Sequence, residues 1–255
     1  MPVMQGLGWT FDTVAETYAK LRPGYVDALY RDIFAYCPLD ASGMAVEVGI
    51  GGGQATRPIL ETGCAVMAVE PGEAFCGLCR EKFAAYPTFS VINGKFEDVV
   101  FPPESCDLVY SASAFHWVPE EIGYRKVFNM LKPGGAFARF ANHPWRDKGN
   151  PALAAALDDT YAQYYHSYYR SVPKLEDEYT EAQAIARAQI AAKYGFIDIR
   201  HHLYHRKREF TAAEYVQLLG TYSDHINLPE EVRLPFFRAK NHAPSMPPST
   251  APKRV

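Results

Sequence analysis

The sequence lacks a long hydrophobic run and a strong charge of either sign. No apolar stretch reaches the roughly 18 residues that a membrane-spanning helix needs. The N-terminal residues carry no lysine or arginine and lead into no apolar stretch, so we expect no secretion signal. The net charge is −3, so the protein has no overall positive potential that would attract nucleic acid. These features predict a soluble cytoplasmic protein without nucleic-acid or membrane partners, and they leave its oligomeric state open.

Cysteine is scarce, with five residues in the chain. An odd number without a secretion signal favours reduced thiols. Cys76 and Cys79 form a Cys-x-x-Cys pattern, which can indicate a metal site or redox chemistry. No second pair of cysteines or histidines completes a tetrahedral site, so we interpret the two cysteines as neighbours on one helix.

Short apolar runs alternate with helical patterns between residues 44 and 142. Continuously apolar strands separated by helices are typical of a parallel sheet covered on both faces. With right-handed crossovers, the pattern predicts an α/β fold with a doubly wound, mostly parallel sheet. We expect strands at 44–48, 64–69, 89–92, 106–111 and 135–141, and helices at 54–62, 73–86 and 120–131, preceded by two helices within 11–36.

In the second half of the chain, strands and helices no longer alternate. Residues 151–194 are predicted to be mostly helical, with one break at Pro173, and Gly195 is a plausible helix stop. We expect a strand at Ile197–Arg206, whose basic side chains would form its solvated face. Thr211 begins a capping-box pattern before a further helix, and a last helix is expected at 230–240. We predict a single domain over residues 1–240 and a disordered, proline-rich tail at 241–255.

A glycine-rich segment follows the first expected strand. Gly49, Gly51 and Gly53 let the main chain turn tightly and approach a ligand without a Cβ in the way. In a doubly wound sheet this position borders the ligand crevice, and an acid at the end of the next strand, here Glu70, can accept hydrogen bonds from ribose hydroxyls. Dinucleotide-binding proteins require a glycine where this chain has Gln54. The pattern therefore favours a nucleoside-containing cofactor other than NAD.

Six segments in order carry a more specific resemblance. The chain resembles the class I S-adenosylmethionine-dependent methyltransferases, in particular the type 11 branch that acts on small molecules. The resemblance spans residues 11 to about 142, and the segment TYSDH at 221–225 extends it to about 240. The six segments are FDTVAETYAKLRPGY (11–25), VEVGIGGGQAT (46–56), VMAVEPGEAF (66–75), NGKFED (93–98), CDLVYSASAFHWV (106–118) and MLKPGGAFARF (130–140).

The resemblance implies S-adenosyl-L-methionine as cofactor, a Rossmann-like methyltransferase fold, and a role for each matching residue. The glycines would line the methionine part of the cofactor, Glu47 would support their loop from beneath, and Glu70 would bind the ribose. The other implied cofactor-binding residues are Phe96 and Glu97 near the adenine, Ser111 and Ala112 beside the sulfonium, and Tyr18 and Arg22 in an N-terminal helical lid.

The sequence says less about the residues that surround the methyl acceptor. His116 is the candidate general base, but it could instead cap the helix that follows. His143 is a second candidate of the same kind. Four tyrosines lie on one face of a helix within 151–194, where the family places a cap over the acceptor. They are either core residues or part of an aromatic acceptor site, to which Trp117 and Trp145 would add. These tyrosines are Tyr161, Tyr164, Tyr165 and Tyr168.

One departure from the family concerns the C-terminus. Family members continue into a seventh strand, which pairs with the sixth, but the proline-rich tail contains no strand pattern. We therefore expect the seventh strand to be missing and the strand at Ile197–Arg206 to have an unpaired edge.

The sequence thus predicts an enzyme that transfers a methyl group from S-adenosylmethionine to a small-molecule acceptor by in-line displacement, mainly through positioning. A non-catalytic S-adenosylmethionine-binding protein, with activity lost through its altered C-terminus, is the alternative. Neither the acceptor nor the atom that receives the methyl group follows from the sequence.

Overall fold

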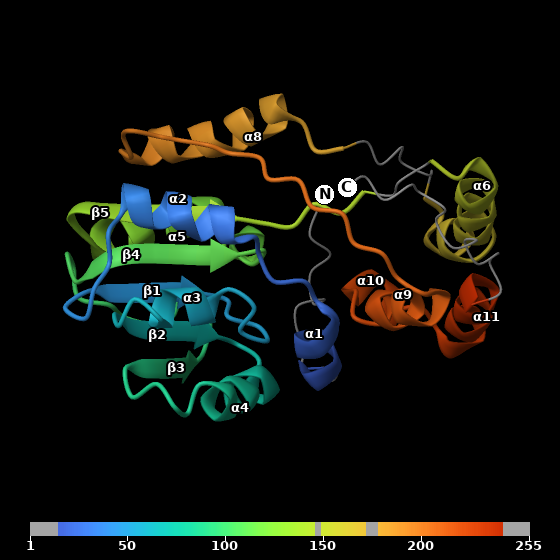
Figure 1. The fold of residues 1–255 in the computed structure, drawn as a ribbon, viewed down its shortest axis with the longest axis horizontal. Coiled ribbons are helices and arrows are strands. Elements are labelled where there is room, and N and C mark those ends of the chain that lie inside the picture. Colours follow the sequence, from blue (N-terminus) through green and yellow to red (C-terminus); the bar gives the residue numbers. More distant parts are fainter. Residues whose placement is uncertain (1–14, 146–148, 172–177, 242–255) are drawn as a thin grey trace, which may run out of the picture. The chain divides into compact units, whose positions relative to one another are not determined.

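A computed structural model describes residues 15–145, 149–171 and 178–241. The chain divides into two compact units (Figure 1). Unit 1 comprises Met1–His143 and Glu178–Arg206, and unit 2 comprises Pro144–Asp177 and Lys207–Val255. The helical region expected at 151–194 is therefore shared between them, since its last part belongs to unit 1. None of the helices in the described ranges has the length and hydropathy needed to cross a membrane.

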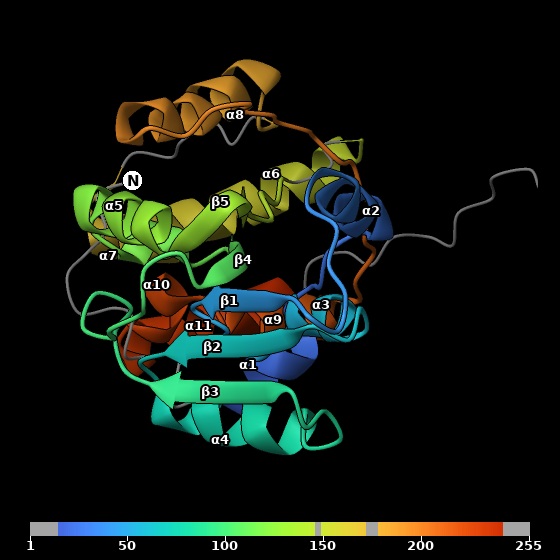
Figure 2. The same cartoon turned by 90° about the vertical axis from the view of Figure 1, so that its left-hand side faces the viewer.

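Unit 1 is built on a five-stranded parallel sheet in the order β3-β2-β1-β4-β5 (Figure 2). The chain adds β2 and β3 on one side of β1 and then returns to add β4 and β5 on the other side. This reversal creates the switch point at which doubly wound folds bind ligands, and it confirms the predicted fold class. The strands are β1 (Met44–Val48), β2 (Ala65–Glu70), β3 (Phe89–Asn93), β4 (Cys106–Ala112) and β5 (Leu131–Phe140).

Helices of unit 1 cover both faces of the sheet, because successive side chains of each buried strand point to opposite faces. Ala45 of β1 packs in a cluster with Ile33, Ile59 and Phe83, from α2, α3 and the residue after α4. Val46 packs in the second cluster, on the opposite face, with α5. The helices are α1 (Ala15–Leu21), α2 (Asp27–Tyr36), α3 (Thr56–Leu60), α4 (Glu73–Lys82), α5 (Glu120–Met130) and α8 (Glu181–Ala188), with the 3-10 turns η2 (Phe115–Trp117) and η4 (Gln189–Tyr194).

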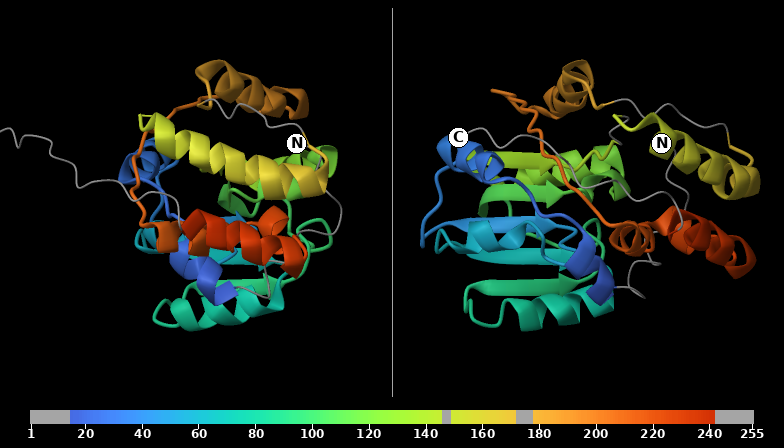
Figure 3. Two further views of the ribbon diagram at one scale, coloured as in Figure 1. Left: turned by 90° about the vertical axis from the view of Figure 1, so that its right-hand side faces the viewer. Right: turned by 45° about the vertical axis from the view of Figure 1, so that its right-hand side comes forward.

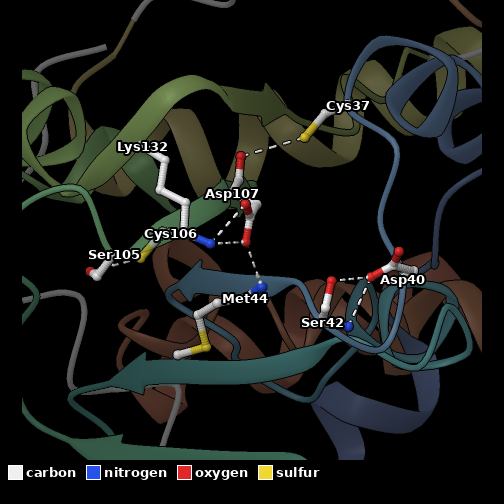
Figure 4. A network of polar contacts seen from close by, with 8 residues as sticks. All are labelled: Cys37, Asp40, Ser42, Met44, Ser105, Cys106, Asp107 and Lys132. Atoms are coloured by element: carbon white, nitrogen blue, oxygen red, sulfur yellow. Dashed lines mark hydrogen bonds and ion pairs between the residues drawn. The ribbon is translucent and has the colours of Figure 1, made fainter.

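The amino ends of three strands are tied together by Asp107, near the start of β4 (Figure 4). Its Oδ2 accepts a hydrogen bond from the main-chain N–H of Met44 on β1 (2.8 Å), and both oxygens accept from Nζ of Lys132 on β5 (2.8 and 2.9 Å). Burial alone would raise the pKa of Asp107, but the hydrogen bonds from Lys132 and Met44 outweigh it and lower the pKa. The charged form of Asp107 is therefore the one that stabilises the fold.

The strand expected at Ile197–Arg206 is absent, and that prediction is wrong. The segment is held by side chains along α2 instead: Tyr36 donates to Asp198 O (2.9 Å), and Tyr204 donates to Asp32. Asp198 has a φ of +50°, which interrupts an extended run. Within the described ranges the sheet ends at β5, and the segment forms no ladder with that edge strand. The predicted disordered tail falls outside the described residues, except for Asn241, which ends α11.

Unit 2 is helical (Figure 3). The 161–166 segment forms a π-helix, η3, beside α11, and the Thr211 capping box is present as predicted. Tyr161, Tyr164 and Tyr165 pack against the buried cluster that contains Phe236, whereas Tyr168 is exposed. The helices are α6 (Pro151–Thr160), η3 (Tyr161–His166), α7 (Ser167–Tyr169), α9 (Ala212–Leu219), α10 (Ser223–Ile226) and α11 (Glu230–Asn241).

We predict that Asp107→Asn destabilises the protein by about 1–2 kcal/mol at neutral pH, since it removes a charge-assisted hydrogen bond to a half-exposed lysine. Because the folded-state pKa of Asp107 is depressed, its contribution is fully present above the unfolded-state pKa of about 3.9 and is lost as the pH falls through the folded-state pKa. The difference between the two proteins in urea unfolding should thus shrink below about pH 4. Glu61→Gln, which alters an exposed carboxylate, serves as control; equal stability of Asp107→Asn and the parent at pH 7 would contradict this account.

Candidate functional site

The glycine loop leaves β1 in a conformation that side chains rarely allow. Gly49, Gly51 and Gly53 have φ angles of +73°, +52° and +69°. This left-handed region costs other residues free energy, so glycine is required at these positions. A Cβ on Gly49 would also lie 2.4 Å from the Cβ of Ala114, which follows β4. The loop therefore presents bare main chain at the switch point of the sheet.

Glu70, the last residue of β2, lies beside this loop. Its Oε2 accepts a hydrogen bond from Gly51 N (2.9 Å), and its Oε1 accepts from Gly72 N (3.0 Å). The two elements predicted to bind one cofactor thus face one another. Each carboxylate oxygen can accept two hydrogen bonds, so such a group can hold the main chain and ligand hydroxyls together.

Glu47 of β1 is fully buried below the loop. Its Oε2 accepts hydrogen bonds from Thr56 Oγ1 (2.7 Å) at the start of α3 and from Tyr110 Oη (2.8 Å) on β4. Burial raises the pKa of Glu47 to about 7, against the effect of these two hydrogen bonds. Oε1 has no hydrogen-bond partner among the described residues. A buried polar atom of this kind calls for a water molecule or a ligand donor.

Helix α1 lies against the other side of the glycine loop and against α4, as Figure 1 shows. A Cβ on Gly52 would come within 2.6 Å of the Cβ of Ala19, and a Cβ on Gly51 would lie 3.6 Å from the ring of Tyr18. The Arg22 guanidinium lies 4.9 Å from the centre of the Tyr18 ring, a cation–π contact. The two lid residues predicted from the sequence are therefore beside the loop, while their contact with a cofactor stays a prediction.

The other residues expected to bind the cofactor differ in their surroundings. Phe96 is buried in the core beside Phe101, so its ring contributes packing. Ser111 is buried, and its Oγ donates to Val48 O (2.8 Å), which links the carboxyl ends of β4 and β1. Ala112 ends β4, and Glu97 is half-buried.

His116 lies in η2, just after β4, and keeps exposed surface. Its pKa is lowered by partial burial and by the positive charges of Arg139 and Arg187. Its imidazole is therefore neutral near pH 7, as a general base requires. The ring of His143 stacks on Tyr179 with centroids 3.9 Å apart, and its pKa is also lowered by burial.

Three residues that sequence reasoning did not single out meet where β4 and β5 end. Ser113 has a φ of +58°, a strained value for a residue that is not glycine. Its Oγ forms a hydrogen bond with Tyr25 Oη (2.9 Å) and accepts one from Asn142 N (3.3 Å). Burial raises the pKa of Tyr25 to about 12, so its hydroxyl stays protonated. Ser113 lies two residues after the strand expected at 106–111, and this position was the available signal.

Cys76 and Cys79 lie buried on α4, as interpreted from the sequence. Their thiols donate to Glu70 O (3.4 Å) and Gly51 O (3.2 Å). In the described ranges, no group of three or more histidine, cysteine, aspartate or glutamate side chains is arranged to hold a metal ion.

Comparison with known proteins identifies the family of the chain. A family model described as a methyltransferase domain matches residues 46–138, which include the glycine loop and β4. An uncharacterized methyltransferase of Geobacillus kaustophilus is 31% identical over 196 residues, covering 73% of this chain and 86% of the relative. An uncharacterized methyltransferase of Schizosaccharomyces pombe is 22% identical over 231 residues, covering 88% of this chain and 83% of that protein.

A solved structure shows the same fold. A protein of Anaeromyxobacter dehalogenans that carries the name type II methyltransferase superposes with a TM-score of 0.54 at 23% identity. The match covers 88% of this chain and 91% of the other. Together with the site geometry, these relatives show that the chain belongs to the type 11 family of class I S-adenosylmethionine-dependent methyltransferases.

Proposed function

We propose that the protein transfers a methyl group from S-adenosylmethionine to a small-molecule acceptor. The observation that supports this most directly is the hydrogen bond between Glu70 Oε2 and Gly51 N. It brings the acid and the bare loop to one place, where a nucleoside would need an acceptor for its hydroxyls and close access to the main chain.

The described residues fit this cofactor. A Cβ on Gly49 would come within 2.4 Å of the side chain of Ala114, and one on Gly53 within 2.6 Å of the Phe83 ring, so neither position has room for a side chain. Glu70 would accept the ribose hydroxyls, and Glu47 Oε1 offers a buried acceptor without a partner in the described part of the chain. The main chain of Phe96 and Glu97 would face the adenine, since the Phe96 ring belongs to the core.

When bound, S-adenosylmethionine supplies a methyl group on a positively charged sulfur. The task of the protein is then to hold the acceptor in line with that methyl group and to exclude water. Tyr18 on α1 and Arg22, the residue after that helix, would cover the loop. The end of β4 at Ser111 and Ala112 would border the sulfur. The protonated Tyr25 hydroxyl, held by Ser113, can donate a hydrogen bond to an acceptor oxygen.

An acceptor that must lose a proton would use His116 as general base. Neutral imidazole at physiological pH suits this role, although a lowered pKa also makes it a weak base. Carboxylate acceptors carry their own nucleophile and would need no base. His116 therefore matters only for acceptors that must lose a proton.

A second candidate function is S-adenosylmethionine binding without methyl transfer. The absence of the strand expected at 197–206 favours this alternative, because relatives are expected to carry that strand. Methyl transfer to any compound of a metabolite panel would exclude it.

Isothermal calorimetry tests the cofactor. We expect the protein to bind S-adenosylhomocysteine and not NAD, because Gln54 occupies the position of the third glycine of a dinucleotide site. Binding of NAD without S-adenosylhomocysteine would overturn the proposed function.

Glu70→Ala should weaken S-adenosylhomocysteine binding by about 10- to 100-fold, the loss expected when a carboxylate no longer accepts hydrogen bonds from ligand hydroxyls. Glu73→Ala removes an exposed acid three positions later and is the matched control. If both variants bind as tightly as the parent, the ribose does not lie at Glu70.

The ionisation of His116 can be followed by NMR, its signal being assigned by its disappearance in His116→Gln. Desolvation and the nearby arginines lower its pKa to about 4, so the signal should not shift between pH 8 and 6 and should move only at lower pH. A titration midpoint at or above the ordinary value of about 6.5 would contradict the environment described for this residue.

A further inference from the structure

The carbonyl groups of the glycine loop are held from behind by α4. Lys82, the last residue of α4, donates from Nζ to Gly52 O (2.7 Å) and Gly53 O (2.9 Å). Cys79, one turn earlier, donates to Gly51 O (3.2 Å). Three consecutive carbonyls of the loop therefore point toward one helix.

This arrangement determines where the loop points its N–H groups. In a planar trans peptide, the C=O of one residue and the N–H of the next point in opposite directions. With the carbonyls of Gly51 and Gly53 turned to α4, the N–H groups of Gly52 and Gln54 point away from it. The N–H of Gly53, between them, is bonded to Ile50 O (3.0 Å), so Gly52 and Gln54 are the two positions of this stretch whose N–H groups can turn toward a ligand. Main-chain N–H groups of a loop can bind an anion, and the Lys82 ammonium behind them adds positive charge.

A second lysine holds the loop after β3 in the same way. Lys126 of α5 donates from Nζ to the carbonyls of Phe96 and Glu97, the latter at 2.9 Å. Its ammonium lies 5.0 Å from the centre of the Phe96 ring and 5.8 Å from that of Phe101. These contacts fix the main chain at the place where the proposed function puts the adenine.

We propose that Lys82 and Lys126 are positioning residues for the two ends of the cofactor. Lys82, supported by Cys79, shapes the glycine loop for the carboxylate of the methionine part, and Lys126 shapes the loop that receives the adenine. This inference rests on the proposed function. Neither lysine touches the reacting atoms, and each acts through the main chain that it holds.

The test compares two ligands that differ in the methionine part. S-adenosylhomocysteine contains the carboxylate, whereas 5′-methylthioadenosine has the same adenosine without it. Lys82→Met should weaken binding of S-adenosylhomocysteine by about tenfold and that of methylthioadenosine by less than about twofold. Lys126→Met should weaken both to a similar extent, because both contain the adenine. Each variant is the matched control for the other.

A second measurement does not depend on any ligand. Hydrogen exchange of main-chain amides covering 49–56 in the ligand-free protein should become faster in Lys82→Met and stay unchanged in Lys126→Met. Thermal unfolding establishes that each variant is folded. If Lys82→Met does not fold, Lys82→Gln, which retains one hydrogen-bond donor, replaces it.

The outcomes separate the inference from the proposed function. An unchanged ratio of the two affinities in a folded Lys82 variant, in a protein that binds S-adenosylhomocysteine, overturns the inference alone. If the parent protein binds neither S-adenosylhomocysteine nor methylthioadenosine, the proposed function is overturned and the inference with it. A selective loss for S-adenosylhomocysteine, with faster exchange in the loop, supports both.

Discussion

One carboxylate joins the two elements on which the site depends. Glu70 ends β2 and accepts hydrogen bonds from the N–H groups of Gly51 and Gly72, so it links the glycine loop to the start of α4. The loop must keep three left-handed residues, a conformation with few local contacts of its own. A buried acid that binds its main chain stabilises that shape before any ligand arrives. Preorganisation of this kind lowers the entropic cost of binding.

Other contacts hold the loop from its remaining sides. Glu47 lies beneath it and binds the start of α3 through Thr56, and Lys82 of α4 holds its carbonyls. These contacts come from β1, α3 and α4, which share one hydrophobic cluster on one face of the sheet. The geometry of the loop is therefore coupled to the packing of the core, and core variants on this face should act on the site through the loop.

The doubly wound sheet could be predicted from the sequence because its strands are short, buried and continuously apolar; β1 matches its expected bounds, Met44–Val48. Helix α3 begins later than expected, since the loop continues to Ala55 and Thr56 is bound by Glu47. The strand predicted at Ile197–Arg206 was wrong because strand formation depends on pairing with a neighbouring strand, which a local sequence pattern does not show. Nor does the local pattern show that side chains of α2 bind this segment.

The sequence predicted the geometry of the candidate site where it rests on a special main chain or a fixed position after a strand: the glycines are left-handed, and Glu70 ends β2 beside them. Their binding of a cofactor stays a prediction. The geometry was not predictable where distant residues meet. Tyr25 and Ser113 are 88 positions apart, and only the fold shows their hydrogen bond. Likewise, the sequence left two possible roles for the tyrosines of η3, and only the fold of unit 2 shows that they pack against the cluster that contains Phe236.

The central claim is that a nucleoside lies against the glycine loop and is held by Glu70. A crystal structure with S-adenosylhomocysteine tests it most directly. The account predicts ribose hydroxyls within hydrogen-bond distance of the Glu70 carboxylate and the methionine part along Gly49–Gly53. A ligand bound elsewhere, with Glu70 and the loop as they are here, would contradict it.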